Sequence, residues 1–390
     1  MDASTLALTE GVWAELIGQE RVVATLRRAV AGDRHAMTHA WLVTGPPGSG
    51  RSNAARAFAA ALQCPEGGCG VCRSCTTALS GAHPDVTLVR TEKLSIGVDE
   101  VRDLVRRAAM APTLGRFQVL IVEDADRVTE RGADALLKAI EEPAPRTVWL
   151  LCAPSPDDVI VTIRSRCRRV ELSTPNEHAI AELLQRRDGV DAETAGFAAR
   201  VSQGHIGRAR ALARNPAARE QRAKVLAIPQ RLGSLGECLG AAAAVVQSAT
   251  DEAARVTAEL DARERTELSE ALGMTTRGAR PRNAQAALSA LEDEQKLRAK
   301  RLQRDALDRV LTELTSYYRD VLVLQTGAGG PLINSEFAEP IAEAAGRLTP
   351  AATVQRLDAL LACRTALETN VAPLLALEAL MLALAGATGR

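Results

Sequence analysis

Gly45-Pro46-Pro47-Gly48-Ser49-Gly50-Arg51-Ser52 is the stretch that decides the fold. An apolar run ends just before it at Val43, and an Ala-rich run of helical character begins at Ser52. A strand, a glycine loop and a helix in this order are the context in which the pattern G-x-x-x-x-G-K-[ST] cradles phosphates with backbone N–H groups and binds Mg²⁺ through the hydroxyl. The stretch therefore predicts a site for ATP or ADP with Mg²⁺. A plain Gly/Pro turn is the alternative.

Position 51 departs from that pattern, because Arg51 stands where lysine is expected. Arginine also binds phosphate, but its planar guanidinium is larger than an ammonium group and is not the same compact point charge. A phosphate loop with this substitution can hold nucleotide without hydrolysing it. Whether hydrolysis occurs depends on the residues elsewhere in the chain.

Strand and helix patterns alternate around the loop from Trp41 to Leu172, which implies a parallel α/β sheet with helices on both faces. The expected strands are 41–43, 85–90, 117–122 and 147–152, and the expected helices are 52–62, 100–110 and 129–142. Glu123 and Asp124 follow the almost continuous apolar run 117–122. Folds of this kind place Mg²⁺ and water-orienting groups at such strand ends, although acids also cap strands without a catalytic role.

Four cysteines follow the helix after the loop, in the pattern C-x4-C-x2-C-x2-C: Cys64, Cys69, Cys72 and Cys75. Thiolates at these spacings can wrap one tetrahedral Zn²⁺, and the glycines at 67, 68 and 70 permit the tight turns. Free thiols and disulfides are the alternatives. Since all four positions would be cysteine, the metal would have no open coordination position and a structural role.

Length and charge constrain the rest of the chain. The sequence has 390 residues, and Lys+Arg and Asp+Glu both number 48, so a general polyanion binder is not indicated. We expect an α/β nucleotide-binding domain at 1–172 with its zinc insertion at 64–75, a helical lid at 173–217 and an all-helical domain at 218–390. Charged stretches after Asp251 are interpreted as solvated faces of packed helices, and residues 273–283 as a mobile loop.

No secretory signal pattern is present at residues 1–10, and no apolar run reaches transmembrane length. We therefore expect a cytoplasmic protein with no membrane contact.

The order of these parts resembles the AAA+ subunits of the bacterial clamp loader of DNA polymerase III, the complex that opens the sliding clamp and places it on primed DNA. The matching features lie within residues 1–215: the phosphate loop, the zinc insertion, His83-Pro84-Asp85, the helix from Ala135 to Pro143, and Ser165-Arg166-Cys167. The helical C-terminal part is similar, by class only, to the collar through which these subunits oligomerise.

The resemblance offers two types of subunit, the gamma/tau ATPase and the delta prime stator. Four departures from the ATPase pattern favour the stator. Arg51 replaces lysine, and the acidic pair is reversed to Glu123-Asp124. Ala153-Pro154-Ser155 stands where γ-phosphate-sensing polar residues are expected, and Gly207 occupies the slot of the lid's sensing arginine, with Arg208 one residue late.

Ser165-Arg166-Cys167 is complete, by contrast. In the family its arginine enters a neighbour's ATP site as an arginine finger, and such residues are worth about 10³ to 10⁵ in rate elsewhere. A surface arginine in an Arg-rich turn at 164–169 is the alternative interpretation of Arg166.

The resemblance thus implies a subunit of the delta prime type in a hetero-pentamer with gamma/tau and delta. Its further partners would be the sliding clamp and primer–template DNA, the latter contacted through the phosphate backbone. Structural Zn²⁺ is the expected cofactor, and ATP or ADP with Mg²⁺ the possible nucleotide. An active clamp-loader ATPase, and a non-replicative P-loop enzyme or zinc-stabilised adaptor, are the competing interpretations.

Overall fold

The structure is a computed structural model that describes residues 10–33, 35–91, 95–272, 284–369 and 371–386. The chain divides into two compact units, Met1–Asn215 and Pro216–Arg390. The predicted α/β domain and most of the predicted lid share the first unit. The predicted loop at 273–283 lies outside the described residues.

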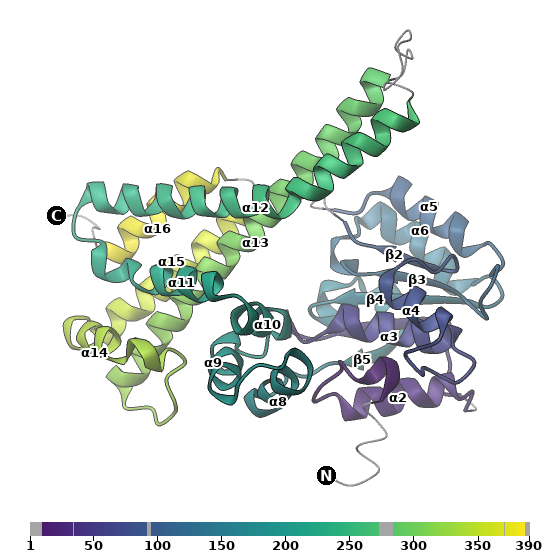
Figure 1. The fold of residues 1–390 in the computed structure, drawn as a ribbon, viewed down its shortest axis with the longest axis horizontal. Coiled ribbons are helices and arrows are strands. Elements are labelled where there is room, and N and C mark those ends of the chain that lie inside the picture. Colours follow the sequence, from purple (N-terminus) through teal and green to yellow (C-terminus); the bar gives the residue numbers. More distant parts are fainter. Residues whose placement is uncertain (1–9, 34, 92–94, 273–283, 370, 387–390) are drawn as a thin grey trace. The chain divides into compact units, whose positions relative to one another are not determined.

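The first unit is built on a parallel five-stranded sheet in the order β2-β3-β4-β1-β5 (Figure 1). Its strands are β1 (Ala40–Thr44), β2 (Val86–Val89), β3 (Gln118–Val122), β4 (Thr147–Ala153) and β5 (Arg168–Glu171). Every residue of the central strands β1, β3 and β4 is buried, as their apolar runs predict. The predicted parallel α/β fold is confirmed.

The edge strand β5 is not predicted by the sequence, because it begins with two arginines that are typical of a solvated turn. Arg168 lies over the Trp41 ring at 5.3 Å, and its Nη1 donates to the carbonyl of Ala36 at 2.6 Å. Only Val170 is buried in this strand. An edge strand with one apolar residue gives no periodic signal in the sequence.

Helices cover both faces of the sheet and create two cores. Along β1, Trp41 and Val43 face a core that includes α2 (Glu20–Val30) and α3 (Arg51–Gln63). Ala40 and Leu42 face a second core with α5 (Val98–Ala108) and α6 (Glu130–Glu141). The remaining elements of the α/β part are α4 (Arg73–Ser80), α7 (Val161–Arg164) and the 3-10 turns η1 (Gly11–Trp13), η2 (Ala125–Arg127) and η3 (Pro156–Asp158).

Three short helices complete the first unit, as predicted: α8 (Glu177–Asp188), α9 (Ala192–Ser202) and α10 (Ile206–Arg214). Asn176, Asp191 and His205 cap their N-termini with side-chain acceptors. Asp188, whose side chain is 4% exposed, accepts two hydrogen bonds of 3.0 Å from Arg210, which joins α8 to α10. We call residues 173–215 the lid.

The second unit is all-helical. It consists of α11 (Pro216–Leu226), η4 (Ile228–Arg231), α12 (Leu235–Ala271), α13 (Ala284–Thr326), η5 (Ser335–Phe337), α14 (Ala338–Arg347), α15 (Pro350–Glu368) and α16 (Pro373–Ala385). Leucine, alanine and a tyrosine pair, Tyr317 and Tyr318, dominate its core. Among the described residues, no helix has both the length and the apolarity needed to span a bilayer.

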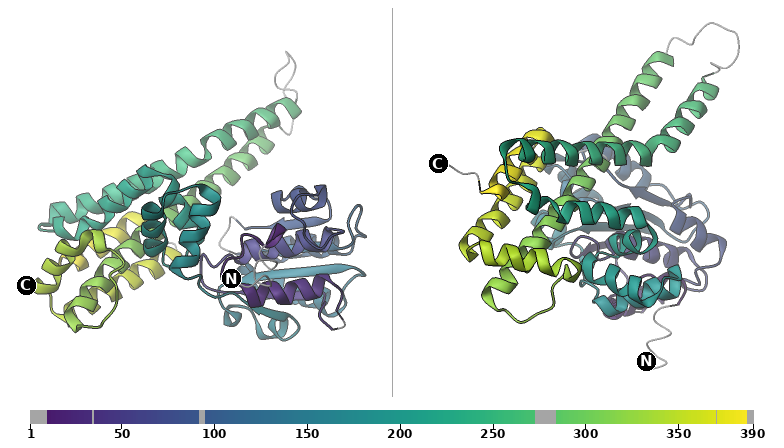
Figure 2. Two further views of the ribbon diagram at one scale, coloured as in Figure 1. Left: turned by 60° about the horizontal axis from the view of Figure 1, so that its bottom comes forward. Right: turned by 60° about the vertical axis from the view of Figure 1, so that its left-hand side comes forward.

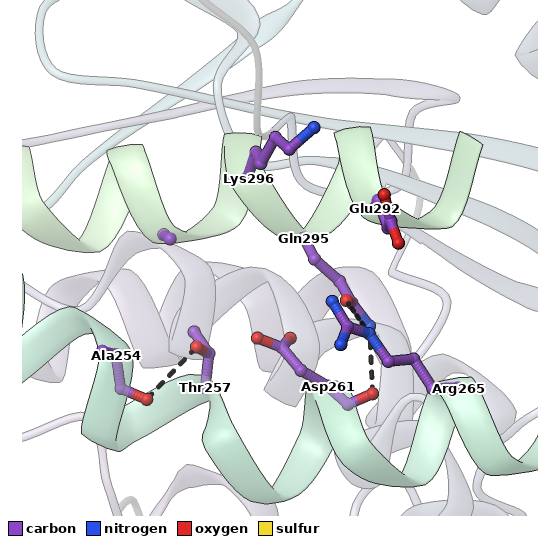
Figure 3. Close-up of a pocket in the computed structure, with 8 residues that line it drawn as sticks. Ala254, Thr257, Asp261, Arg265, Glu292, Gln295 and Lys296 are labelled. Atoms are coloured by element: carbon purple, nitrogen blue, oxygen red, sulfur yellow. Dashed lines mark hydrogen bonds between the residues drawn. The ribbon is translucent and has the colours of Figure 1, made fainter. Parts of the chain in front are cut away.

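The helices α12 and α13 form a long antiparallel hairpin (Figure 2). In its charged half, buried Gln295 accepts from Arg265 Nε at 3.1 Å and donates to the Asp261 carbonyl at 3.1 Å (Figure 3). Arg298 pairs with Asp261 and Glu264 across the same seam. The charged stretches after Asp251 are therefore solvated on their outer faces and hydrogen-bonded to each other at the helix–helix interface.

Candidate nucleotide site, arginine finger and cysteine cluster

The phosphate loop connects β1 to α3 and is tied to the end of β4. The Gly45 amide donates to the Pro154 carbonyl at 3.2 Å, and the Ser49 amide donates to the Pro46 carbonyl at 3.1 Å. Gly50 has a φ of +94°, which turns the chain into α3 at Arg51. The hydroxyl of buried Ser49 has no hydrogen-bond partner among the described residues. A helix N-terminus beside an unsatisfied hydroxyl fits a phosphate group.

Arg51 folds back onto its own loop, where its Nη1 donates to the carbonyl of Gly45. The guanidinium therefore satisfies a carbonyl of the loop that carries it. A bound phosphate would compete with that carbonyl for this donor.

Glu123, the first of the predicted acids, is held by two arginines. Its Oε1 lies 2.9 Å from Arg56 Nη2, its Oε2 lies 3.8 Å from Arg90 Nε, and its side chain is 8% exposed. A carboxylate in this environment is already charge-compensated, so recruiting Mg²⁺ to it requires breaking the ion pairs. Sequence reasoning missed Arg56 and Arg90. The repeated arginine on α3, five residues after Arg51, was the one available signal.

Asp124 and Asp126 lie close to this cluster. Burial raises the pKa of Asp126, and the negative charge of Asp124 adds to the effect, while the positive charges of Arg127 and Arg51 oppose it. The structure thus brings Arg51, Glu123 and Asp124 to one edge of the sheet, as the sequence predicts. It adds Asp126, which the sequence analysis did not single out.

Ser155 was the one polar residue in the predicted sensing segment after β4. Its hydroxyl accepts a hydrogen bond of 3.2 Å from the Asp157 amide and caps the turn η3. The hydroxyl is therefore used for local structure.

The lid rests directly on the phosphate loop. Gly48 has a φ of +81°, and a Cβ built on it would lie 2.3 Å from Cγ of His205. The Ile206 amide points to the Gly48 carbonyl at 3.4 Å. Gly207 lies beside the same imidazole and brings no side chain, while Arg208 serves as the amide donor to His205 Nδ1. Sequence reasoning missed His205, whose only signal was its position at the start of a helix.

Arg166 stands just after α7 with its side chain 42% exposed. Its Nη1 donates to the Thr162 carbonyl at 3.0 Å and to Ser165 Oγ at 3.2 Å, and its Nη2 lies 2.7 Å from Glu141 Oε1. Ile160 and Val161, at the start of α7, are 38% and 63% exposed. Half-buried Cys167 has its pKa raised to about 12 by burial, so it behaves as a packing residue.

The four cysteines converge. All four sulfur atoms lie within 4.8 Å of one another, and the distances from Cys64 Sγ to those of Cys69 and Cys72 are both 3.7 Å. Tetrahedral Zn²⁺ with bonds of about 2.3 Å requires sulfurs about 3.8 Å apart. The cluster can therefore hold one metal ion.

Backbone amides prepare this cluster for negative charge. The amides of Cys69, Cys72 and Cys75 point to the sulfurs of Cys64, Cys69 and Cys72 at 3.4 to 3.5 Å. Burial opposes ionisation of Cys64, but hydrogen bonds from the amides of Cys69, Gly68 and Glu66 and from the Cys75 side chain outweigh it and lower the pKa of Cys64 to about 6. Burial and the neighbouring sulfurs raise the pKa of Cys75. When sulfurs lie this close without a cation, a thiolate at one cysteine disfavours ionisation of its neighbours.

The cysteine loop also packs on the start of the described chain. The Gly68 carbonyl accepts from the Val12 amide at 3.1 Å, and a Cβ on Gly11 would lie 2.1 Å from that carbonyl oxygen. Close approach of two backbones is possible here because both positions lack side chains. Metal binding would thereby brace η1 together with the loop.

His83-Pro84-Asp85 supports the loop that precedes β3. Buried Asp85 accepts from the amides of Thr113, Leu114 and Gly115 at 2.6, 2.8 and 2.5 Å. Burial opposes the charge on Asp85, but these amide donors outweigh it and hold its pKa below the ordinary value. The motif is thus explained as a structural brace.

Comparison with known proteins gives matches in both units. The family model of the DNA polymerase III delta subunit matches residues 18–176, and the model of the C-terminal part of that delta subunit matches residues 263–386. The gamma/tau subunit of Mycobacterium tuberculosis is 40% identical over 159 residues, which are 40% of this chain and 27% of that protein. The delta prime subunit of Bacillus subtilis is 33% identical over 211 residues, 53% of this chain and 63% of that protein.

The delta prime subunit of Pseudomonas aeruginosa is 37% identical over 161 residues, 40% of this chain and 49% of that protein. The chain thus spans between 27% and 63% of the length of these curated relatives. Among solved structures, the RuvB branch migration motor of Thermotoga maritima overlaps 57% of this chain and 67% of its own with a TM-score of 0.39 and 18% identity. A gamma-subunit-related protein from Thermotoga maritima overlaps 74% of this chain and 99% of its own with a TM-score of 0.35 and 17% identity.

The parallel sheet, the phosphate loop after β1, the acids after β3 and the helical lid define a P-loop protein of the AAA+ class. Relatives of both the delta prime and the gamma/tau type match part of the chain, and both family models describe the delta subunit. Over residues 18–176 and 263–386 the chain belongs to the DNA polymerase III delta subunit family.

Proposed function

We propose that the chain is a clamp-loader subunit of DNA polymerase III of the delta prime type. In this role it lends Arg166 to a neighbouring subunit's ATP site and hydrolyses no ATP itself. The single observation that carries the proposal is a contrast between two charged groups. Glu123, at the position of the Mg²⁺-binding acid, is compensated by Arg56 and Arg90, whereas Arg166 is 42% exposed on the outside of the unit.

Several features of the chain's own site support the absence of hydrolysis. Arg51 bonds back to Gly45, Ser155 is used as a cap, and Gly207 provides no sensing side chain on the lid. Phosphoryl transfer needs a metal-binding acid, a compact cation and γ-phosphate contacts at the same time. The unsatisfied Ser49 hydroxyl supports nucleotide binding without turnover.

The surface around Arg166 supports a role across a subunit interface. Ile160 and Val161 expose apolar surface beside it, as a contact face for a protein partner would. The partners we propose are gamma/tau and delta subunits in a hetero-pentamer, the sliding clamp, and primer–template DNA contacted through its phosphates. The names of the relatives, gamma/tau and delta prime subunits of DNA polymerase III, support this assembly.

The cysteine cluster is proposed to hold structural Zn²⁺ through Cys64, Cys69, Cys72 and Cys75. The sulfur separations of 3.7 Å and the converging amides support a tetrahedral thiolate site. When bound, the metal would cross-link the loop between α3 and α4 and leave no position for substrate.

The test is reconstitution with gamma/tau, delta, the clamp and primed DNA. Replacing Arg166 with alanine should lower the turnover of the neighbouring site by about 10³-fold or more. Arg169→Ala removes an exposed arginine three residues away and should leave the ATP turnover of the assembly unchanged. If the Arg166→Ala assembly keeps the full DNA-stimulated rate of ATP hydrolysis, the proposed arginine-finger role is refuted. Hydrolysis by this chain alone, lost on Arg51→Ala, would instead favour an active ATPase subunit.

A further inference from the structure

Glu141 ends α6, and Glu142 follows it as the C-cap. Carboxylates at this end of a helix oppose the helix dipole, which favours cations there. Two consecutive glutamates at the unfavourable end of a helix indicate that at least one of them is kept for an interaction outside the helix. Glu141 forms an ion pair with Arg166, at 2.7 Å between Oε1 and Nη2.

The guanidinium of Arg166 is held from two sides. Both hydrogens of Nη1 have acceptors within its own turn, the Thr162 carbonyl and the Ser165 hydroxyl. Glu141, from a different element, fixes Nη2. The arginine side chain is long and flexible, so these three contacts restrict it to few conformations. It therefore loses less conformational entropy when it binds phosphate.

The strength of the ion pair fits a residue that must be released. Glu141 is 43% exposed and Arg166 42%. Ion pairs at this exposure contribute little and are easily exchanged. A phosphate group can offer guanidinium two oxygens in a bidentate pair, whereas the ion pair with Glu141 uses one oxygen, so phosphate can take over the Nη2 edge.

We propose that Glu141 is a positioning residue for Arg166: it holds the guanidinium in the direction from which it enters the neighbouring ATP site, and gives way to phosphate there. This role rests on the arginine finger proposed above. It assigns Glu141, the last residue of α6, a task in catalysis by the assembly, which neither the fold nor the core requires.

The experiment uses the full chain in the reconstituted assembly. The readout is the part of DNA-stimulated ATP turnover that is lost on Arg166→Ala. Glu141→Ala should lower the kcat of that part about tenfold, since small misplacement of a catalytic group is costly, with KM for ATP unchanged. Glu141→Gln keeps an acceptor at the same reach and should restore most of the rate. The matched control Glu142→Gln removes a neighbouring charge and should have no effect.

A double variant tests whether Glu141 acts through Arg166. In the Arg166→Ala background, Glu141→Ala should cause no further loss. The inference is overturned if Glu141→Ala matches wild type, if Glu142→Gln shows the same loss, or if the loss is one of assembly on a sizing column. If Arg166→Ala itself has no effect, the proposed function fails first, so the two failures are distinguishable.

Discussion

Asp85 should be one of the most important single side chains for the stability of the first unit. It is 1% exposed, and its carboxylate accepts from three consecutive amides of the loop before β3. Hydrogen bonds to a charged group contribute about 1.5 to 3 kcal/mol each, before the cost of burying the charge is subtracted. Asp85→Ala leaves three amides without their acceptor and should lower the free energy of unfolding by about 3 to 5 kcal/mol.

Asp85→Asn is the more informative variant. It keeps one carbonyl oxygen but replaces the other with an amide nitrogen, which would face N–H donors, so about half of the loss is expected. Asp99→Asn is the matched control, because Asp99 lies on the exposed face of α5, where it pairs with Arg102. That variant should change stability by less than about 0.5 kcal/mol.

Denaturant unfolding combined with amide hydrogen exchange measures the effect and locates it. Exchange at residues 113–115 should accelerate in Asp85→Ala, while exchange in the lid stays as in wild type. The reasoning is refuted if Asp85→Ala is as stable as Asp99→Asn and residues 113–115 keep their protection. A drop in stability without faster exchange at those amides would also contradict the proposed brace.

The remaining predictions concern pH, backbone, metal and nucleotide. Because the folded-state pKa of Asp85 lies below its ordinary value of 3.8, its stabilisation is full above that value and is lost as pH falls through the folded pKa; acid titration of stability should flatten in Asp85→Asn. Gly48→Ala should lower the melting temperature more than Gly32→Ala. Both glycines have a positive φ, +81° and +77°, but only at Gly48 would the new Cβ meet His205. Equal losses would show that backbone strain alone acts. Changing Cys72 and Cys75 to serine should abolish the stoichiometric zinc found in the parent protein by metal analysis, and a parent without zinc would contradict the site. Arg51→Lys should tighten binding of fluorescent ADP without phosphate release from ATP, because Glu123 stays paired with Arg56 and Arg90; release of phosphate would refute that block.

What the sequence predicts and what it misses follow from the range of the interactions involved. The buried strands were predicted because a strand covered on both faces must be apolar throughout, as 118–122 and 147–153 largely are. The cysteine cluster was predicted because four cysteines at this spacing can reach a single metal ion. Strand β5 was missed since Arg168 and Arg169 occupy half of it.

The ion pairs of Glu123 at the candidate nucleotide site could not be predicted from the linear sequence. Glu123 belongs to the end of β3, Arg56 to α3 and Arg90 to the end of β2, and only the sheet order brings their charges together. The lid's contact through His205 depends likewise on how residues 205–207 meet Gly48. Local departures from the ATPase pattern led to the proposal that this site does not hydrolyse ATP, whereas the ion pairs that support the proposal are tertiary contacts.

The same tertiary contacts explain how the unit stays folded if, as proposed, Glu123 binds no Mg²⁺. An acid that no longer binds Mg²⁺ would be a buried charge without a partner, which is costly for a side chain that is 8% exposed. Arg56 and Arg90 remove that cost. Arg166 differs, because its exposed ion pair with Glu141 costs little to open. We therefore expect Arg56→Ala to destabilise the unit without restoring hydrolysis, and Arg166→Ala to spare stability while slowing the neighbouring site. A stable Arg56→Ala variant, or an Arg166→Ala variant that loses stability and leaves the neighbouring site's rate unchanged, would contradict this assignment.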